Sequence, residues 1–185
     1  TSTSRFTGKT HLPNPLTFGL IGSVYKEMLL DDLRVYSREI SQEEITASYN
    51  SGSGAEPSDP TNMISRWKFD ESGVNQRTSA NAVDSENPML CIGYAPLAVS
   101  SPLGGGIEFD GLGNNQGINF GNKVVYDIAE IGTTIEVYYK ANATQFGTNR
   151  RLVDRANTDP GTTRGWRQLL YGTTEVGIVI NTTPG

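Results

Sequence analysis

Apolar and polar residues alternate with a period of two through much of the chain, a pattern that predicts β-strands with one buried face. The clearest example forms the predicted core face of one strand: Leu29, Asp31, Leu33 and Val35. Similar stretches recur from residue 64 onward, separated by Gly, Pro, Asn or Ser about every 8 to 12 residues. This spacing is typical of an antiparallel sandwich or jelly roll, so we expect an all-β fold.

One short helical turn is predicted after this strand. Ser41 and Glu44 have the spacing of a capping box, in which each side chain bonds the backbone N–H of the other residue. We expect the turn to carry Ile45 and Tyr49 inward, against the domain.

A boundary is predicted immediately after the helical turn. Residues 51–63 are mostly polar and contain Gly, Ser and Pro, which indicates a linker. The chain is thereby divided into two parts, residues 1–50 and residues 64–185. The two parts do not resemble each other and look complementary.

Composition narrows the function classes. The formal charge of −5 and the scattered positions of the 15 Lys and Arg residues argue against a nucleic-acid partner, which would need clustered basic residues. No apolar run approaches the roughly 20 residues of a membrane span. Cys91 is the only cysteine and His11 the only histidine, so neither a disulfide framework nor cysteine catalysis is expected.

Two sets of phrases carry a family resemblance. LLDDLRVYSREIS, followed by EEI and Tyr49, resembles the last strand and helical turn of laminin-G-like domains in the concanavalin A-like lectin and glucanase superfamily. RWKFDESG, GGGIEFDGLGN and TTIEVYYKAN, which come later in the chain, are similar to the opening and following strands of the same family. The sequence that resembles the end of the domain therefore precedes the sequences that resemble its beginning.

The resemblance implies a concanavalin A-like jelly-roll sandwich of antiparallel strands, present as complementary parts. Residues 1–50 would be the C-terminal strands of a laminin-G-like jelly roll, and residues 64–185 the N-terminal and inner strands. One interpretation is a piece cut across two neighbouring domains of a tandem array. The other is a rotated order, in which residues 1–50 complete residues 64–185 of the same chain or of a neighbouring copy. Either part alone would expose unpaired strand edges, so each needs a counterpart.

Asp31 is the sharpest local anomaly, because an acid on a core face needs a partner. First and last strands of a jelly roll are commonly adjacent, which would bring Asp31 near Asp70 or Glu71. Hard oxygen ligands suit Ca²⁺, and the resemblance implies a structural calcium near this location. The alternative is that these acids bond to backbone amides or to Arg34 and Arg66.

For glycan binding, the resemblance implies aromatic rings that stack on sugar faces. The candidates are Tyr138, Trp166 and Tyr171, and the alternative for each is ordinary sheet or core packing.

Hydrolysis is not expected. Retaining glucanases of this fold carry an E-x-D-x-x-E strand whose alternation places the acids on one face. Here Glu108 and Asp110 are followed by Gly111-Leu112-Gly113, so the last acid is missing.

The expected role is therefore a non-catalytic module on the outside of a cell or virus particle, for glycan recognition or adhesion. Its partners would be a glycan or cell-surface polysaccharide, and neighbouring domains or copies of itself. Two other functions stay open: a structural building block of a viral capsid, tail or filament, and an accessory domain of a glycan-active enzyme.

Overall fold

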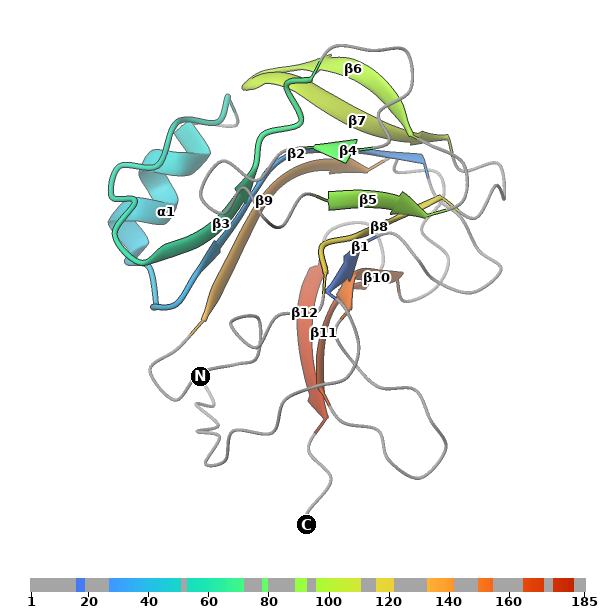
Figure 1. Ribbon diagram of the computed structural model, residues 1–185. Coiled ribbons are helices and arrows are strands. Elements are labelled where there is room, and N and C mark those ends of the chain that lie inside the picture. Colours follow the sequence, from blue (N-terminus) through green and yellow to red (C-terminus); the bar gives the residue numbers. More distant parts are fainter. Residues whose placement is uncertain are drawn as a thin grey trace.

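The computed structural model describes the backbone of residues 16–18, 27–50, 53–71, 78–79, 89–92, 96–110, 116–121, 133–141, 150–154, 165–171 and 175–181 (Figure 1). The elements in chain order are β1 (Thr17–Phe18), β2 (Glu27–Tyr36), α1 (Gln42–Tyr49), β3 (Met63–Trp67), β4 (Thr78–Ser79), β5 (Met89–Ile92), β6 (Leu97–Ser101), β7 (Gly104–Asp110), β8 (Gly117–Asn119), β9 (Thr134–Ala141), β10 (Arg150–Asp154), β11 (Gly165–Tyr171) and β12 (Glu175–Asn181). Strands in antiparallel sheets dominate, so the predicted all-β class is confirmed.

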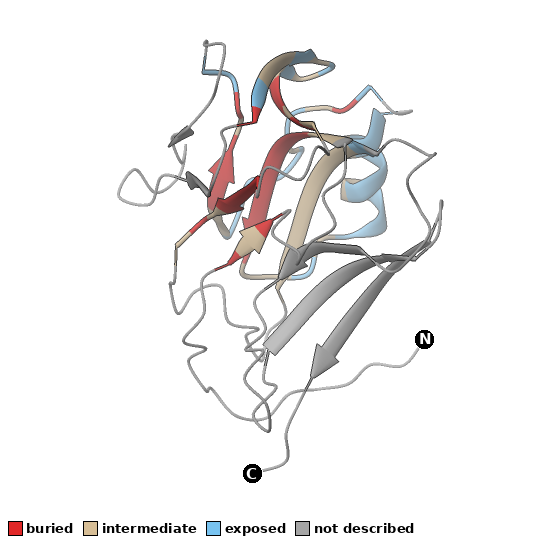
Figure 2. Ribbon diagram, turned by 90° about the vertical axis from the view of Figure 1, so that its right-hand side faces the viewer, coloured by how far each residue is buried: buried red, intermediate tan, exposed pale blue. Residues whose placement is uncertain are grey.

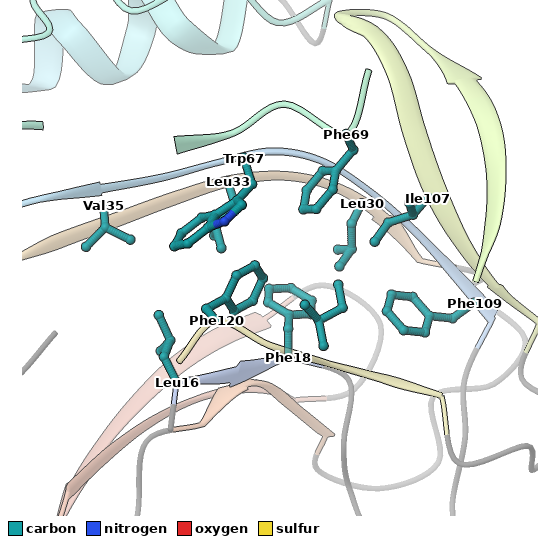
Figure 3. Packing of buried hydrophobic residues seen from close by; sticks show 11 residues of the cluster. Leu16, Phe18, Leu30, Leu33, Val35, Trp67, Phe69, Ile107, Phe109 and Phe120 are labelled. Atoms are coloured by element: carbon teal, nitrogen blue, oxygen red, sulfur yellow. The ribbon is translucent and has the colours of Figure 1, made fainter. Parts of the chain in front are cut away.

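The described strands form two sheets. A seven-stranded sheet has the order β12-β11-β10-β1-β8-β5-β4. A five-stranded sheet has the order β3-β2-β7-β6, with β9 also paired to β2. Side chains from both sheets form one hydrophobic cluster (Figure 3): Leu16, Phe18, Leu30, Leu33, Val35, Trp67, Phe69, Ile107, Phe109, Ile118 and Phe120. The core therefore lies between the two sheets.

Strand β2 is the centre of the five-stranded sheet. Strand β9 pairs with β2 along most of its length, which occupies one edge of β2. The other edge is shared: residues 27–30 pair with β7, and residues 33–36 pair with β3. The strands before and after the 51–63 segment thus pair with each other within one chain.

The predicted alternation of β2 is interrupted by a β-bulge. The pairing of β2 with β9 shifts register between Asp31 and Arg34, and Asp32 has a left-handed φ of 46°. Leu33 and Val35 face the core as predicted, but before the bulge Leu30 is the core residue and not Leu29.

The prediction that Asp31 shares the core face is wrong. The extra residue of the bulge means that Asp31 does not lie on the same face of the sheet as Leu33 and Val35. Asp31 and Asp32 both lie on the side of the sheet that carries Arg34, whose guanidinium bonds the Asp32 carboxylate. Asp31 is nevertheless fully buried, with 0% of its surface exposed.

Helix α1 begins with the predicted capping box, but its apolar side chains are exposed and do not point toward the domain. The Glu44 N–H donates to Ser41 Oγ at 3.3 Å, and the Ser41 N–H donates to Glu44 Oε2 at 2.7 Å. Ile45 and Tyr49 are 44% and 63% exposed, so the expectation that they point inward is wrong. The helix meets the sheet through polar side chains instead, and Figure 2 shows it largely exposed.

Candidate functional site

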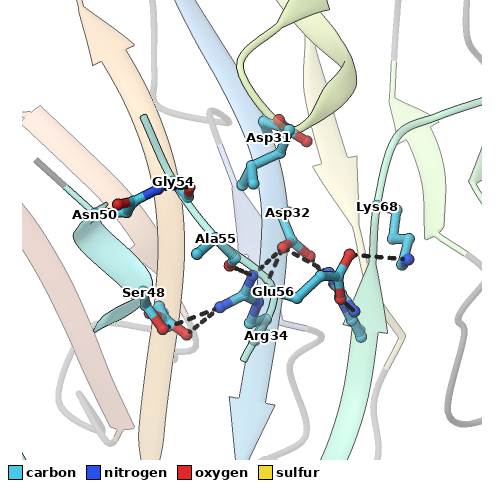
Figure 4. Close-up of polar contacts among 12 residues, drawn as sticks. Asp31, Asp32, Arg34, Ser48, Asn50, Gly54, Ala55, Glu56 and Lys68 are labelled. Atoms are coloured by element: carbon cyan, nitrogen blue, oxygen red, sulfur yellow. Dashed lines mark hydrogen bonds and ion pairs between the residues drawn. The ribbon is translucent and has the colours of Figure 1, made fainter. Parts of the chain in front are cut away.

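A buried ionic network lies on the outer side of the five-stranded sheet (Figure 4). Its centre is Asp32 of β2, which is 3% exposed and accepts hydrogen bonds from two arginines. Arg34 Nε donates to Asp32 Oδ2 at 2.9 Å, and Arg66 Nε of β3 donates to Asp32 Oδ1 at 2.7 Å. Because β2 and β3 come from opposite sides of the 51–63 segment, the network joins the two parts of the chain.

Arg34 extends the network to three further elements. Its Nη1 donates to Glu136 Oε2 of β9 at 3.0 Å and to Ser48 Oγ of α1 at 3.2 Å. Its Nη2 donates to the carbonyl oxygen of Ala55. One guanidinium, only 2% exposed, therefore fixes a strand, the helix and the segment that follows the helix.

The segment predicted as a free linker is tied to the sheet where it is described. Arg66 pairs with Glu56, and Lys68 Nζ pairs with Glu56 Oε1 at 3.3 Å. Arg38 donates to the Thr61 carbonyl oxygen at 2.8 Å and pairs with Asp59 at 3.2 Å. Residues 53–62 form a strap held by ionic contacts, in place of the apolar anchors that its sequence lacks.

Asp31 lies beside this network but outside its ion pairs. Its Oδ2 accepts a hydrogen bond from Ser101 Oγ of β6, whereas Oδ1 has no hydrogen-bond partner among the described residues. Burial raises the pKa of the Asp31 carboxyl to about 6, and the charges of Asp32 and Asp70 act in the same direction. The predicted alternative, an acid paired with Arg34 and Arg66, is realised by Asp32 and not by Asp31.

Asp31 and Asp70 approach the same hairpin, formed by β6 and β7. Asp70 Oδ1 accepts a hydrogen bond from the Gly105 N–H at 2.8 Å. A Cβ atom at Gly105 would lie 2.5 Å from the Phe69 carbonyl oxygen, and one at Gly104 would overlap the Asp70 carboxylate. The hairpin can therefore lie against the end of β3 only because these positions lack side chains.

The predicted calcium ligands are only partly brought together. Asp31 and Asp70 are close enough for their charges to interact, and both Asp70 and Glu71 are exposed. Among the described residues, no group of three or more His, Cys, Asp or Glu side chains is placed to hold a metal ion. An unpartnered buried carboxylate oxygen and a second acid nevertheless fit a cation that takes its other ligands from backbone carbonyls and water.

The titration of Asp31 gives a testable prediction. Its pKa of about 6 lies above the ordinary value of 3.8, so the folded protein binds this proton more tightly than the unfolded protein does. The contribution of Asp31 to stability should therefore fall as the pH rises from about 4 to about 6, by up to about 3 kcal/mol, without added divalent cations. Asp31→Asn keeps the acceptor for Ser101 and removes this fall.

Urea unfolding from pH 4 to pH 7.5 measures the effect as the difference between wild type and Asp31→Asn. Glu39→Gln, at an exposed acid, is the matched control. A constant difference between wild type and Asp31→Asn over this range would contradict a buried carboxyl without a cationic partner.

The predicted sugar-stacking residues come from different sheets. Tyr138 lies on β9 of the five-stranded sheet, paired with Asp31, and is partly buried. Trp166 and Tyr171 lie on β11 of the seven-stranded sheet, paired with Ile180 and Glu175, and their side chains lie outside the described part. No single sheet carries all three.

The acids weighed for hydrolysis flank a core residue. Phe109 is 3% exposed and belongs to the hydrophobic cluster, while its neighbours Glu108 and Asp110 are partly buried. Strand alternation therefore places the two acids together on the face opposite the core.

The residues that organise this site are largely ones that the sequence did not single out. Asp32, Glu56, Glu136 and Ser101 have no motif of their own, and their partners lie far away in the chain. The doublet of acids at 31–32, followed closely by Arg34, is the one local signal of a polar cluster on β2.

Comparison with known proteins gives no relative. No family model, no curated protein and no solved structure matches the chain. Within the described part of the chain, no helix is long and apolar enough to cross a membrane.

Proposed function

We propose that this chain is a non-catalytic jelly-roll module that recognises a glycan on the outside of a cell or virus particle. The observation that supports the proposal is the pairing of β2 with β3. Strand β2 contains most of the sequence LLDDLRVYSREIS, which resembles the family's last strand. Strand β3 contains the start of RWKFDESG, which resembles its first strand. These two strands are commonly adjacent in a jelly roll, and here Leu33 pairs with Trp67.

The arrangement of the acids favours binding over hydrolysis. Asp32 and Glu136 are held by Arg34, which leaves them engaged in structure. Glu108 and Asp110 share a face without the third acid of the glucanase strand. The module therefore offers a rigid scaffold for recognition, and the ligand class rests on the family resemblance.

A glycan array tests the ligand class. The wild-type protein should bind at least one glycan, and the variants Tyr138→Ala, Trp166→Ala and Tyr171→Ala identify the stacking ring by weakening binding about tenfold. Tyr49→Ala, at an exposed tyrosine on α1, is the matched control and should leave binding unchanged. The proposal would be overturned if no glycan bound, or if all three variants bound the glycan as tightly as the wild type.

Asp31 and Asp70 would hold a structural Ca²⁺ at the β6–β7 hairpin. The ion would neutralise the buried carboxylate oxygen of Asp31 that has no hydrogen-bond partner in the described part of the chain, and so stabilise the contact between β2 and the hairpin. Millimolar CaCl₂ should raise the melting temperature of the wild type above its value in EDTA by several degrees. Asp31→Asn should lose this rise, and Glu71→Gln should keep it; an equal rise in Asp31→Asn would exclude this site.

A further inference from the structure

The outer face of α1 presents apolar side chains that the fold does not use. The helix contacts the rest of the protein through polar groups: Ser48 accepts from Arg34, and Glu44 pairs with Arg38 at 2.6 Å. None of its residues is buried. Ile45 and Tyr49, one helical turn apart, are neighbours on the helix surface and are both exposed. A helix fastened by its polar side leaves its apolar side for another molecule.

Negative charge is concentrated around this face. Residues 37–62, which comprise α1 and its flanking segments, contain five acidic residues and one arginine, a net charge of −4 out of −5 for the whole chain. The arginine, Arg38, is engaged by Glu44 and Asp59. Glu39 and Glu43, which precede Ile45 in the chain, are exposed. Glu56 of this range pairs with Arg66 and Lys68, which leaves Glu39 and Glu43 as the acids outside the described ion pairs.

This charge selects the kind of partner. A second copy of the chain would bring the exposed Glu39 and Glu43 of both copies together, and like charges across an interface are unfavourable. A basic surface would be attracted and steered toward α1, while apolar contacts with Ile45 and Tyr49 would fix it in place.

We propose that the exposed face of α1 docks a basic segment of another protein, in which lysine or arginine residues flank an apolar side chain that packs against Ile45 and Tyr49. This surface shares no residue with the predicted sugar-binding residues, which lie on β9 and β11. The proposal is therefore independent of glycan binding.

A designed peptide serves as the probe. Fluorescence anisotropy measures binding of a labelled helical peptide of alternating lysine and leucine pairs to the full chain. Two other peptides are compared with it: one with glutamate in place of lysine, and one with serine in place of leucine. Wild-type protein should bind the first peptide at least tenfold more tightly than either of the others, and its binding should weaken with salt.

Protein variants locate the site. Ile45→Ser combined with Tyr49→Ser should weaken binding about tenfold, and Glu39→Gln combined with Glu43→Gln should weaken it several-fold and reduce its salt dependence. Leu97→Ser, at a similarly exposed apolar residue on β6, is the matched control and should change binding less than twofold. Thermal unfolding confirms that all variants remain folded, as expected for exposed positions.

Three outcomes would overturn the proposal. Equal binding of the serine-containing peptide would show that charge alone acts. Equal binding by the Ile45→Ser, Tyr49→Ser variant and the wild type would place the interaction elsewhere. Concentration-dependent dimerisation that is lost on Tyr49→Ser would identify the occupant as a second copy of the chain.

Discussion

Replacing Asp32 by alanine is expected to lower the free energy of unfolding by about 3 to 5 kcal/mol. The Asp32 carboxylate accepts hydrogen bonds from both Arg34 and Arg66, and its removal leaves two largely buried guanidinium groups without their common partner. Urea unfolding at pH 7 measures the loss. Since Asp32 links β2 to β3, the unfolding transition should also remain a single one if the two parts form one cooperative unit.

Two further variants make this result specific. Asp32→Asn keeps the side-chain shape and the tolerance for the left-handed φ of 46°, so its loss reports the missing charge together with one acceptor oxygen replaced by a donor. Lys68→Ala removes the 3.3 Å contact with Glu56, a pair whose side chains are 40% and 68% exposed, and should cost less than about 1 kcal/mol. An Asp32→Ala protein as stable as Lys68→Ala would show that the network is not formed.

Trp67→Ala is expected to lower the free energy of unfolding by a similar amount, about 3 to 5 kcal/mol. Trp67 is fully buried on β3, and its ring packs against Phe120 with 4.5 Å between the ring centroids. Phe120 immediately follows β8, so the contact joins the two sheets. Guanidinium unfolding followed by circular dichroism measures the loss.

A double-mutant cycle separates this contact from the general effect of a cavity. Trp67→Ala and Phe120→Ala should show a coupling energy of about 0.5 to 1.5 kcal/mol, as expected for aromatic rings in contact. Trp67→Ala with Val35→Ala is the comparison pair, since Val35 lies in the same cluster. Zero coupling between Trp67 and Phe120 would contradict the packing of one sheet on the other.

The sequence predicted the β-class well because strand alternation and turn residues are local signals. The capping box at Ser41 and Glu44 was predictable for the same reason. It could not predict the bulge at Asp31 and Asp32, because a bulge is defined by the register against a partner strand about a hundred residues away. One extra residue was enough to exchange Leu29 for Leu30 on the core face.

The orientation of α1 shows a second limit of sequence reasoning. The spacing of Ile45 and Tyr49 favoured an inward apolar face, but the position of the helix is set by Arg34 and Arg38. Neither arginine is marked in the sequence as a helix contact. The strap at 53–62 shows the same limit. Its composition indicates a linker, but its path is fixed by Arg34, Arg38 and Arg66.

The candidate site was predictable only in outline. Asp31 stood out as an acid that needs a partner, and the structure gives it a buried position in which one oxygen has no hydrogen-bond partner among the residues described. The two arginines that were expected as partners of Asp31 pair with Asp32 instead. The bulge places this second acid of the doublet between Arg34 and Arg66.

Strands from both sides of the 51–63 segment pair within one chain. A disulfide between β2 and β9 tests this pairing most directly, using Leu29→Cys with Lys140→Cys in a Cys91→Ser background. These positions pair directly, and opposite residues on neighbouring strands fall within disulfide range. Leu29→Cys with Tyr139→Cys is the control, since adjacent strand positions point to opposite faces.

Non-reducing electrophoresis after mild oxidation gives the result. We predict an intramolecular disulfide in monomers of the Leu29→Cys, Lys140→Cys protein and none in the control. Crosslinked dimers only, or equal crosslinking in both proteins, would contradict the pairing of β2 with β9 within one chain.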